Sequence, residues 1–286
     1  MKILKWILIP LLIIVLIIGI AVVGVQIYVK NKYEISMFST IGQLRRIGKP
    51  VDETQLITNG FSDADMVDVQ ALVNASVKDM IVYDADSGYI VNLGNLSGMV
   101  TKISLTDKQV GALAHTIIEQ EFNGQVENGG GDVGVELKQI DFVRTQDNKD
   151  LVNSIFKLDL SSLIAEIPDQ FPFGWLKNRI PQSLYLSSTV EVVKGAQPFS
   201  YTVLHNAITI NALSQEDTEE LLDTLDKLLD SGSAKEFNEL IGQTIMDAMV
   251  GNEDKHGVAY SLSTVGATDF NFVYHDGDDY FEIVRG

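Results

Sequence analysis

The sequence predicts an α+β fold, with an N-terminal transmembrane helix followed by a largely antiparallel sheet packed against long amphipathic helices. Three observations predict it. A long apolar run stands near the start of the chain, several later stretches alternate apolar and polar residues, and amphipathic helical patterns lie before and after these stretches. Strands that follow one another without a helix between each pair favour an antiparallel sheet over a doubly wound parallel one.

The composition is that of a folded protein with an acidic surface. The chain has 286 residues, of which 45% are hydrophobic and 21% charged, and this balance excludes a wholly disordered chain. The formal net charge is −18. Because affinity for nucleic acid depends on neutralising phosphates with lysine and arginine, we expect no nucleic-acid partner.

Residues 6–29 predict a single transmembrane anchor. The run is almost entirely apolar, with Gln26 as its one strongly polar residue, and about 20 such residues span the hydrocarbon core. Trp6 and Tyr28 lie near its two ends, where amphipathic rings are favoured. A cleaved signal peptide is the alternative, but its apolar region is only about 7 to 15 residues long. The longer run favours an uncleaved anchor that holds the chain in the membrane.

The distribution of charge divides the rest of the chain. Residues 30–49 carry five lysines and arginines against Glu34, and alone they would favour retention of the following domain in the cytoplasm. Residues 50–286 carry 14 basic and 38 acidic residues, and long domains translocate largely regardless of charge. With no cysteine in the chain, we expect a single-pass protein of the cell membrane whose domain is exported. The predicted parts are an anchor (1–29), a basic juxtamembrane stalk (30–60) and an acidic extracytoplasmic α+β domain (61–286).

Apolar residues at helical spacing predict the helices. Two helices open with a capping box or a close variant of it, Thr106 with Gln109 and Ser62 with Asp65. Leucines line one face of the third, and a fourth carries its apolar face from Phe237 onward. We expect the domain's helices at about residues 62–79, 106–124, 214–231 and 237–251.

Alternating apolar and polar residues predict the strands and their turns. Asp276-Gly277 supplies the positive φ angles of a tight hairpin, and Asp84 to Gly88 is typical of a turn between two short strands. A calcium loop is disfavoured there, because Tyr89 and Asn95 occupy the positions where an EF-hand has glycine and glutamate. We expect strands at residues 133–142 (with an irregularity), 155–160, 185–193, 199–204, 207–212, 258–264, 270–275 and 280–284.

No pattern of residues predicts catalysis. The chain has no cysteine and no Gly-x-Ser-x-Gly elbow, and its four histidines lie far apart without the spacing of metal ligands. We therefore expect no enzyme, no metal site and no cofactor. A hydrolase with two facing carboxylates is a third, distant alternative, because 39 acidic residues guarantee many accidental pairs.

Three segments resemble a type of envelope protein. They are residues 103–113 (ISLTDKQVGAL), 180–190 (IPQSLYLSSTV) and 208–217 (ITINALSQED). With the anchor, they resemble uncharacterised single-pass envelope proteins of Gram-positive bacteria and TULIP-like (tubular lipid-binding) domains, over about residues 100–230. The resemblance implies a long helix wrapped by a strongly curved sheet, with a hydrophobic groove between them. It supplies no catalytic residue.

An apolar helix stripe and an aromatic stretch are the candidate lining of such a groove. Both sets of side chains could equally fill a closed core. Proline and glycine within residues 171–176 disfavour a regular strand or helix there. The candidate residues are Val110, Leu113, Ile117, Ile118, Phe171, Phe173 and Trp175.

Two functions remain as predictions from the sequence. The first is a membrane-anchored extracytoplasmic domain that binds a lipid or another apolar ligand in cell-envelope assembly. The alternative is a protein-interaction module of the envelope that needs no small-molecule ligand. A continuous apolar cavity would favour the first, and a closed core with an exposed apolar patch would favour the second.

Overall fold

A computed structural model describes residues 46–49, 51–126, 134–166, 181–229, 232–275 and 278–285. The predicted anchor at residues 6–29, most of the predicted stalk and the aromatic stretch at 171–176 lie outside these residues. Within the described ranges, no helix combines the length and the apolar character that a bilayer span requires. The architecture is α+β and every strand pair is antiparallel, as the sequence predicts.

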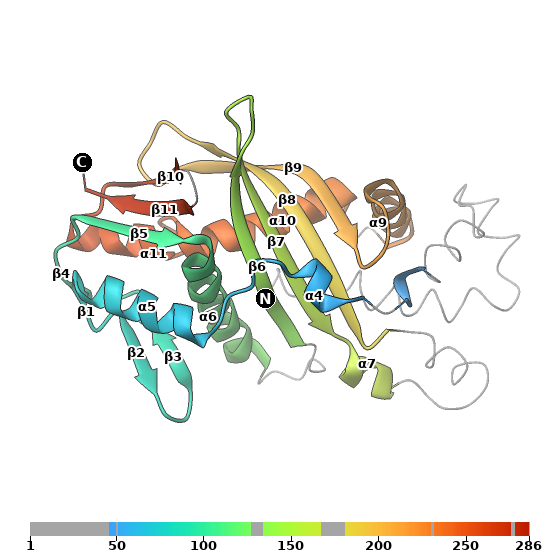
Figure 1. The fold of residues 1–286 in the computed structure, drawn as a ribbon, viewed down its shortest axis with the longest axis horizontal. Coiled ribbons are helices and arrows are strands. Elements are labelled where there is room, and N and C mark those ends of the chain that lie inside the picture. Colours follow the sequence, from blue (N-terminus) through green and yellow to red (C-terminus); the bar gives the residue numbers. More distant parts are fainter. Residues whose placement is uncertain are drawn as a thin grey trace, which may run out of the picture.

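An open four-stranded sheet, in the order β6-β7-β8-β9, forms the centre of the molecule (Figure 1). Each strand pairs with its neighbour in the chain, so the sheet is a simple meander. The irregularity expected in the first strand is a register shift between Leu137 and Gln139. The strands are β6 (Gly134–Arg144), β7 (Asp150–Asp159), β8 (Ser183–Lys194) and β9 (Tyr201–Ile210).

Helices cover one face of this sheet. Helix α6 (Asp107–Val126) packs on β6, helix α10 (Ala234–Met249) crosses the back of β8 and β9, and helix α9 (Gln215–Leu229) packs on β9 (Figure 1). The predicted capping box of α6 is confirmed, because the Thr106 N–H donates to Gln109 Oε1 at 3.0 Å. Alternate residues of the strands therefore form the core with the apolar faces of these helices.

A glycine sets the distance between α10 and the sheet. A Cβ atom at Gly242 would lie only 2.7 and 2.8 Å from methyl groups of Val190 and Val203. The absence of a side chain lets the helix backbone approach the strands this closely. The buried side chains Ile241 and Ile245 of the same helix extend the contact along the sheet.

A second, three-stranded sheet lies beside the first. It has the order β10-β11-β5 and consists of β5 (Lys102–Thr106), β10 (Asp269–His275) and β11 (Asp278–Val284). The predicted hairpin between the last two is confirmed by pairing of His275 with Asp278. The two sheets meet at an aromatic cluster, in which the Phe142 ring lies 5.0 Å from Phe272 and 6.3 Å from Phe281.

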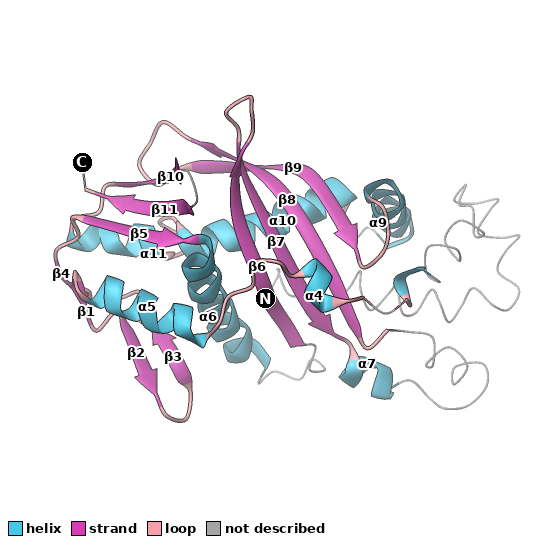
Figure 2. Ribbon diagram, in the orientation of Figure 1, coloured by secondary structure: helices cyan, strands magenta, loops and turns pink. Residues whose placement is uncertain are grey.

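Residues 63–100 form a smaller layer on α6, with two short antiparallel strand pairs (Figure 2). The short helix at residues 53–56 lies instead against β7, where Glu53 Oε1 accepts from Lys157 Nζ at 2.8 Å. The predicted capping arrangement of the layer's main helix is confirmed, because the Ser62 N–H donates to Asp65 Oδ2 at 2.8 Å. The elements of this part of the chain are α4 (Glu53–Leu56), α5 (Asp63–Asn74), β1 (Val77–Lys78), β2 (Ile81–Asp84), β3 (Gly88–Val91) and β4 (Ser97–Gly98). The short helix α7 (Ser161–Glu166) follows β7.

The strand predicted at residues 258–264 is wrong. The segment forms α11 (Val258–Ser261) and the 3-10 helix η1 (Leu262–Val265), which ends at Gly266 with a φ of 106°. Val258, Ala259 and Leu262 are buried. Over so short a segment, the same buried residues fit both a two-residue period and a helical period. Periodicity alone therefore cannot distinguish a strand from a helix here.

Smaller differences concern boundaries. The strands expected at 199–204 and 207–212 are one strand, β9, whose register shifts opposite Thr189 and Val190. Residues that fall in the predicted stalk pack on the domain: the Thr58 and Asn59 N–H groups donate to Gln139 Oε1 at 2.9 and 3.0 Å. Residues 58 and 59, which the sequence assigned to the stalk, are therefore in contact with the folded domain.

Candidate functional site

The apolar stripe predicted to line a groove is buried in the core. Val110, Leu113, Ile117 and Ile118 on α6 are all at most 4% exposed and belong to one continuous cluster of packed side chains. Phe171, Phe173 and Trp175, the other predicted lining residues, lie outside the described residues. Among the described residues, the stripe fills a core in the way that most such stripes do.

A small cavity lies at Ile118, between α6, α10 and strands β6–β8. The cavity volume is about 20 Å³, close to the least that one water molecule needs. An acyl chain needs a far larger pocket. The lining side chains are apolar except for one hydroxyl: Ile118, Val135, Phe156, Leu158, Leu186, Ile241 and Thr244.

The outward face of α5 has the opposite character to that expected of a surface helix. The inner face of α5 buries Met66, Val69 and Val73 against α6. On the solvent side, Val67 is 51% exposed and Leu72 is 45% exposed. A solvent-facing helix surface is normally polar, whereas the exposed apolar residues of this one are Ala64, Val67, Ala71, Leu72 and Ala75.

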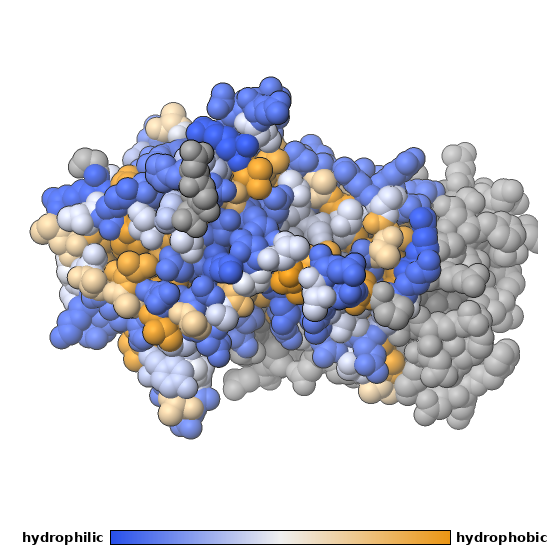
Figure 3. Space-filling model, viewed as in Figure 1, coloured by the Kyte–Doolittle hydropathy of each residue, from blue (hydrophilic) through white to orange (hydrophobic). Residues whose placement is uncertain are grey.

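Two neighbouring segments extend this apolar surface. The Met99 N–H donates to the Ser76 carbonyl at 3.1 Å, which places the exposed Met99 side chain beside the C-terminal end of α5. On the other side, Asn74 Nδ2 donates to the Ile81 carbonyl at 2.7 Å and fixes β2 to the helix. Tyr83 on β2 is 60% exposed. Figure 3 shows hydrophobic side chains gathered over α5.

Acidic residues surround the apolar surface. Residues 61–99 contain six aspartates and one lysine, Lys78, so this layer carries a net charge of −5. Asp68 lies among the apolar residues on α5 and is exposed. Asp84 and Asp86 lie at the tip of the β2–β3 hairpin, where Asp84 Oδ1 accepts from the Asp86 and Ser87 N–H groups at 3.0 and 2.9 Å. These turn hydrogen bonds confirm the predicted Asp/Gly turn and hold the pKa of Asp84 below its usual value.

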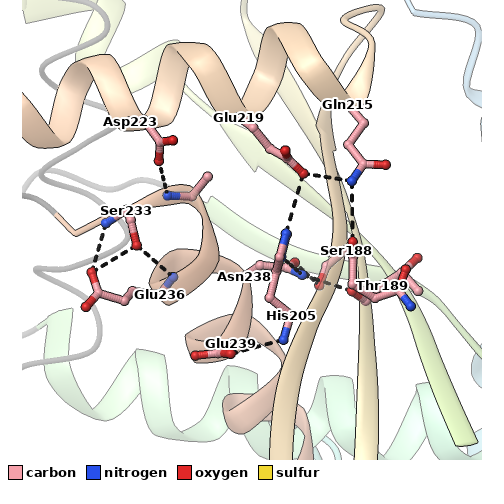
Figure 4. Close-up of polar contacts among 12 residues, drawn as sticks. Ser188, Thr189, His205, Gln215, Glu219, Asp223, Ser233, Glu236, Asn238 and Glu239 are labelled. Carbon is pink, nitrogen blue, oxygen red and sulfur yellow. Dashed lines mark hydrogen bonds and ion pairs between the residues drawn. The ribbon is translucent and has the colours of Figure 1, made fainter. Parts of the chain in front are cut away.

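A polar network joins α9 and α10 to the sheet (Figure 4). Asn238, fully buried on α10, accepts from Ser188 Oγ at 2.6 Å and donates to the Thr189 carbonyl at 2.9 Å. Its amide also lies 2.9 Å from His205 Nδ1. His205 Nε2 in turn faces Glu219 Oε1 at 3.4 Å.

The geometry of this network is structural. Ser188 contacts the asparagine rather than the histidine, and it is 1% exposed, so no base activates it and no substrate can reach it. Each polar group of Asn238 has a partner, which is what burial of an amide requires. The network therefore fixes α10 on the strands.

A second polar cluster ties the end of α10 to β9. Asp247 accepts from Tyr201 Oη at 2.6 Å and from Gln243 Nε2 at 2.7 Å, and it pairs with Lys255. Burial of Tyr201, with the neighbouring carboxylate, raises the pKa of its hydroxyl. The hydroxyl therefore stays protonated and acts as a hydrogen-bond donor.

Metal-binding clusters are not found in the described part of the chain, where no three histidine or acidic side chains converge as ligands. Comparison with protein-family models, curated proteins and solved structures finds no match to this chain.

Sequence reasoning missed the α5 surface. The sequence shows only that apolar residues occur on both faces of this helix, among them Val67, Ala71, Leu72 and Ala75. Only knowledge of which face packs on α6 distinguishes this exposed set from the buried one.

Proposed function

We propose that this chain is a membrane-anchored protein-interaction module of the cell envelope, which contacts a partner protein through the outward face of α5. The observation that carries the proposal is the exposed apolar set around Val67 and Leu72 on an otherwise acidic protein. Single exposed apolar side chains are ordinary, but here five of them lie on one helix face. The extracytoplasmic, single-pass placement rests on the apolar run at residues 6–29 and on the acidic character of the domain.

The energetics favour a covered surface. Burial of a half-exposed valine or leucine contributes about 1 kcal/mol to association. A patch of this kind therefore stabilises a complex without enlarging the core of the isolated protein. Leu113 and Ile117, two of the predicted lining residues, are buried in the core beneath it, and that favours a protein partner over a bound lipid.

Site-specific photo-crosslinking in the cells that make this protein tests the proposal. A photoreactive amino acid is placed at Val67, and a matched variant carries it at Val193, which is 43% exposed on β8. We expect a discrete adduct of defined mass from position 67 and none from position 193. Reciprocal crosslinking from the identified partner should return this chain. The same adducts from both positions, or none from position 67, would contradict the proposal.

Binding of an apolar ligand is a second candidate, and it requires the small apolar cavity at Ile118 to enlarge. The cavity lies where α6, α10 and the sheet meet, and its walls are almost entirely apolar. The test is thermal melting with a long-chain fatty acid. If the cavity expands to bind it, the melting temperature of the wild type should rise and that of Ile118→Trp should not. Equal shifts in both proteins would assign the effect to another part of the chain.

A further inference from the structure

The exposed residues of α5 are arranged to receive another helix. Residues four apart align in rows along a helix, and here the rows are Val67–Ala71–Ala75 and Ala64–Asp68–Leu72. Alanine side chains are small, so Val67 and Leu72, which are 51% and 45% exposed, project beyond them. Ridges that pack into grooves bring two helices to about 8–10 Å between axes.

Charge restricts the chemistry of that second helix. Asp68 lies within one of the two rows, and it makes no hydrogen bond or ion pair with another described side chain. Asp63 at the start of α5 and Asp86 on the adjacent hairpin add to the negative charge of this layer. Lys78 is the one basic residue within residues 61–99.

Two other occupants conflict with this charge. A second copy of the chain would place the aspartates of both copies against each other, because a two-fold interface pairs each patch with itself. Like charges facing one another across an interface are strongly unfavourable. Anionic lipid head groups would be repelled for the same reason.

The first described residues of the chain lie far from α5. Residues 46–49 contact α9 through the Arg46–Asp217 ion pair, and Figure 1 shows α9 and α5 at opposite ends of the molecule.

We infer that the outward face of α5 binds an amphipathic helix of another protein, whose apolar stripe is flanked by lysine or arginine. This inference rests on the proposed function and names the class of partner. The apolar stripe covers Val67 and Leu72, and the flanking cations face Asp68 and the aspartates of the β2–β3 hairpin. Apolar contacts give the affinity, and the opposite charges fix the orientation and reject acidic helices.

The test uses full-length protein in zwitterionic nanodiscs and synthetic helical peptides of about 14 residues, or four turns. Because the chain has no cysteine, Ala71→Cys provides a unique position for a solvent-sensitive fluorophore, and Ala196→Cys in the β8–β9 turn is the matched control. Three peptides are compared: a Leu/Lys amphipathic helix, the same helix with Glu in place of Lys, and a Leu/Lys peptide of scrambled order.

The Leu/Lys helix should shift the emission of the fluorophore at position 71 to the blue and leave that at position 196 unchanged. It should bind at least about tenfold more tightly than the Glu and scrambled peptides. Replacement of Asp68, Asp84 and Asp86 by asparagine should weaken binding severalfold and reduce its dependence on salt.

Three results would overturn the inference: equal binding of the Lys and Glu helices, equal binding of the ordered and scrambled peptides, or a shift produced by anionic vesicles alone. The third would make the surface a lipid contact. Failure here is distinguishable from failure of the proposed function. A specific crosslink from Val67 in cells, together with any one of these three results, would retain the interaction surface and reject the basic helix as its partner.

Discussion

Helices α5 and α10 carry a similar share of apolar residues and use them differently. In α10 the apolar side chains point into the sheet, and Lys235 and Glu236 face the solvent. In α5 the inner face is equally well buried, but Val67 and Leu72 face the solvent as well. A helix that is apolar on all sides is typical of a fully buried position. Helix α10 is therefore complete within this chain, whereas α5 has the composition of a helix with a further neighbour.

The polar groups of the two helices support the same distinction. Asn238 of α10 binds Ser188 and Thr189 of β8 and His205 of β9, so its contacts are internal and fully satisfied. Helix α5 uses Gln70 and Asn74 inward, both of which donate to the Ile81 carbonyl. Its outward face thus has Asp68 as its exposed polar residue beyond the first turn. We therefore expect stability to depend most on α10, and the proposed binding of a partner to depend on α5.

The largest expected effect is on stability, at α10. Ile245→Ala removes a fully buried side chain and should lower the free energy of unfolding by about 2–5 kcal/mol. Leu72→Ala on α5 removes a comparable side chain that faces the solvent. It should change the free energy of unfolding by less than about 0.5 kcal/mol. Denaturant unfolding of both variants measures the difference. Equal losses would mean that α5 is stabilised by contacts of its outward face within this chain.

The next effect tests how closely α10 approaches the sheet. Gly242→Ala places a Cβ atom against Val190 and Val203 and should cost about 1–3 kcal/mol, only partly offset by the better helix propensity of alanine. Thermal melting of the variant measures this cost. A higher melting temperature would show that the helix can move away from the strands without loss.

A smaller effect depends on pH and reports on the α5 side of α6. Burial lowers the pKa of His115, whose ring packs 5.7 Å from Phe61 just before α5. Glu119 and Glu136 oppose this shift and Lys138 adds to it. Because the folded-state pKa is the lower one, the unfolded chain binds the proton first as pH falls.

Stability should therefore decrease as pH falls through the unfolded value near 6.5, by at most about 1.4 kcal/mol per pH unit for one proton. The measurement is denaturant unfolding between pH 7.5 and 5.5. His115→Gln should show a flatter dependence than the wild type. Identical slopes would mean that this side chain is as well hydrated as it is in the unfolded chain.

Substitutions at Val67 and Leu72 should have the smallest effect on stability and the largest effect on partner binding. The double variant Val67→Ser and Leu72→Ser should melt within a few degrees of the wild type, because surface substitutions usually change stability by less than about 0.5 kcal/mol. It should nevertheless lose the crosslinked adduct, read from a photoreactive residue at Ala71. An adduct that persists would place the contact elsewhere.

Local signals in the sequence predicted much of the fold. The capping residues Thr106 and Gln109 marked the start of α6 within one residue, and the alternation at Tyr185 to Val193 marked β8. These signals succeed because each is satisfied within a few residues. The failure at residues 258–264 has the same origin, since four-residue helices provide too short a window for periodicity.

The candidate site was less predictable than the fold. Val110 and Leu113 formed the most regular apolar stripe, and regularity of that kind identifies a core face without saying whether a groove lies beside it. The α5 surface depends on how residues 63–74 rotate about the helix axis relative to α6. That rotation is a property of the packing between two helices, and no local pattern contains it.

The most direct test of the central claim is the accessibility of single cysteines in intact cells. Val67→Cys and Val193→Cys introduce the chain's only thiols at exposed positions on α5 and β8, and a membrane-impermeant maleimide labels each in cells and in purified protein. We expect both to react in purified protein, and position 67 to be protected in cells while position 193 still reacts. Equal labelling at both positions in cells would contradict the claim that a partner covers the outward face of α5.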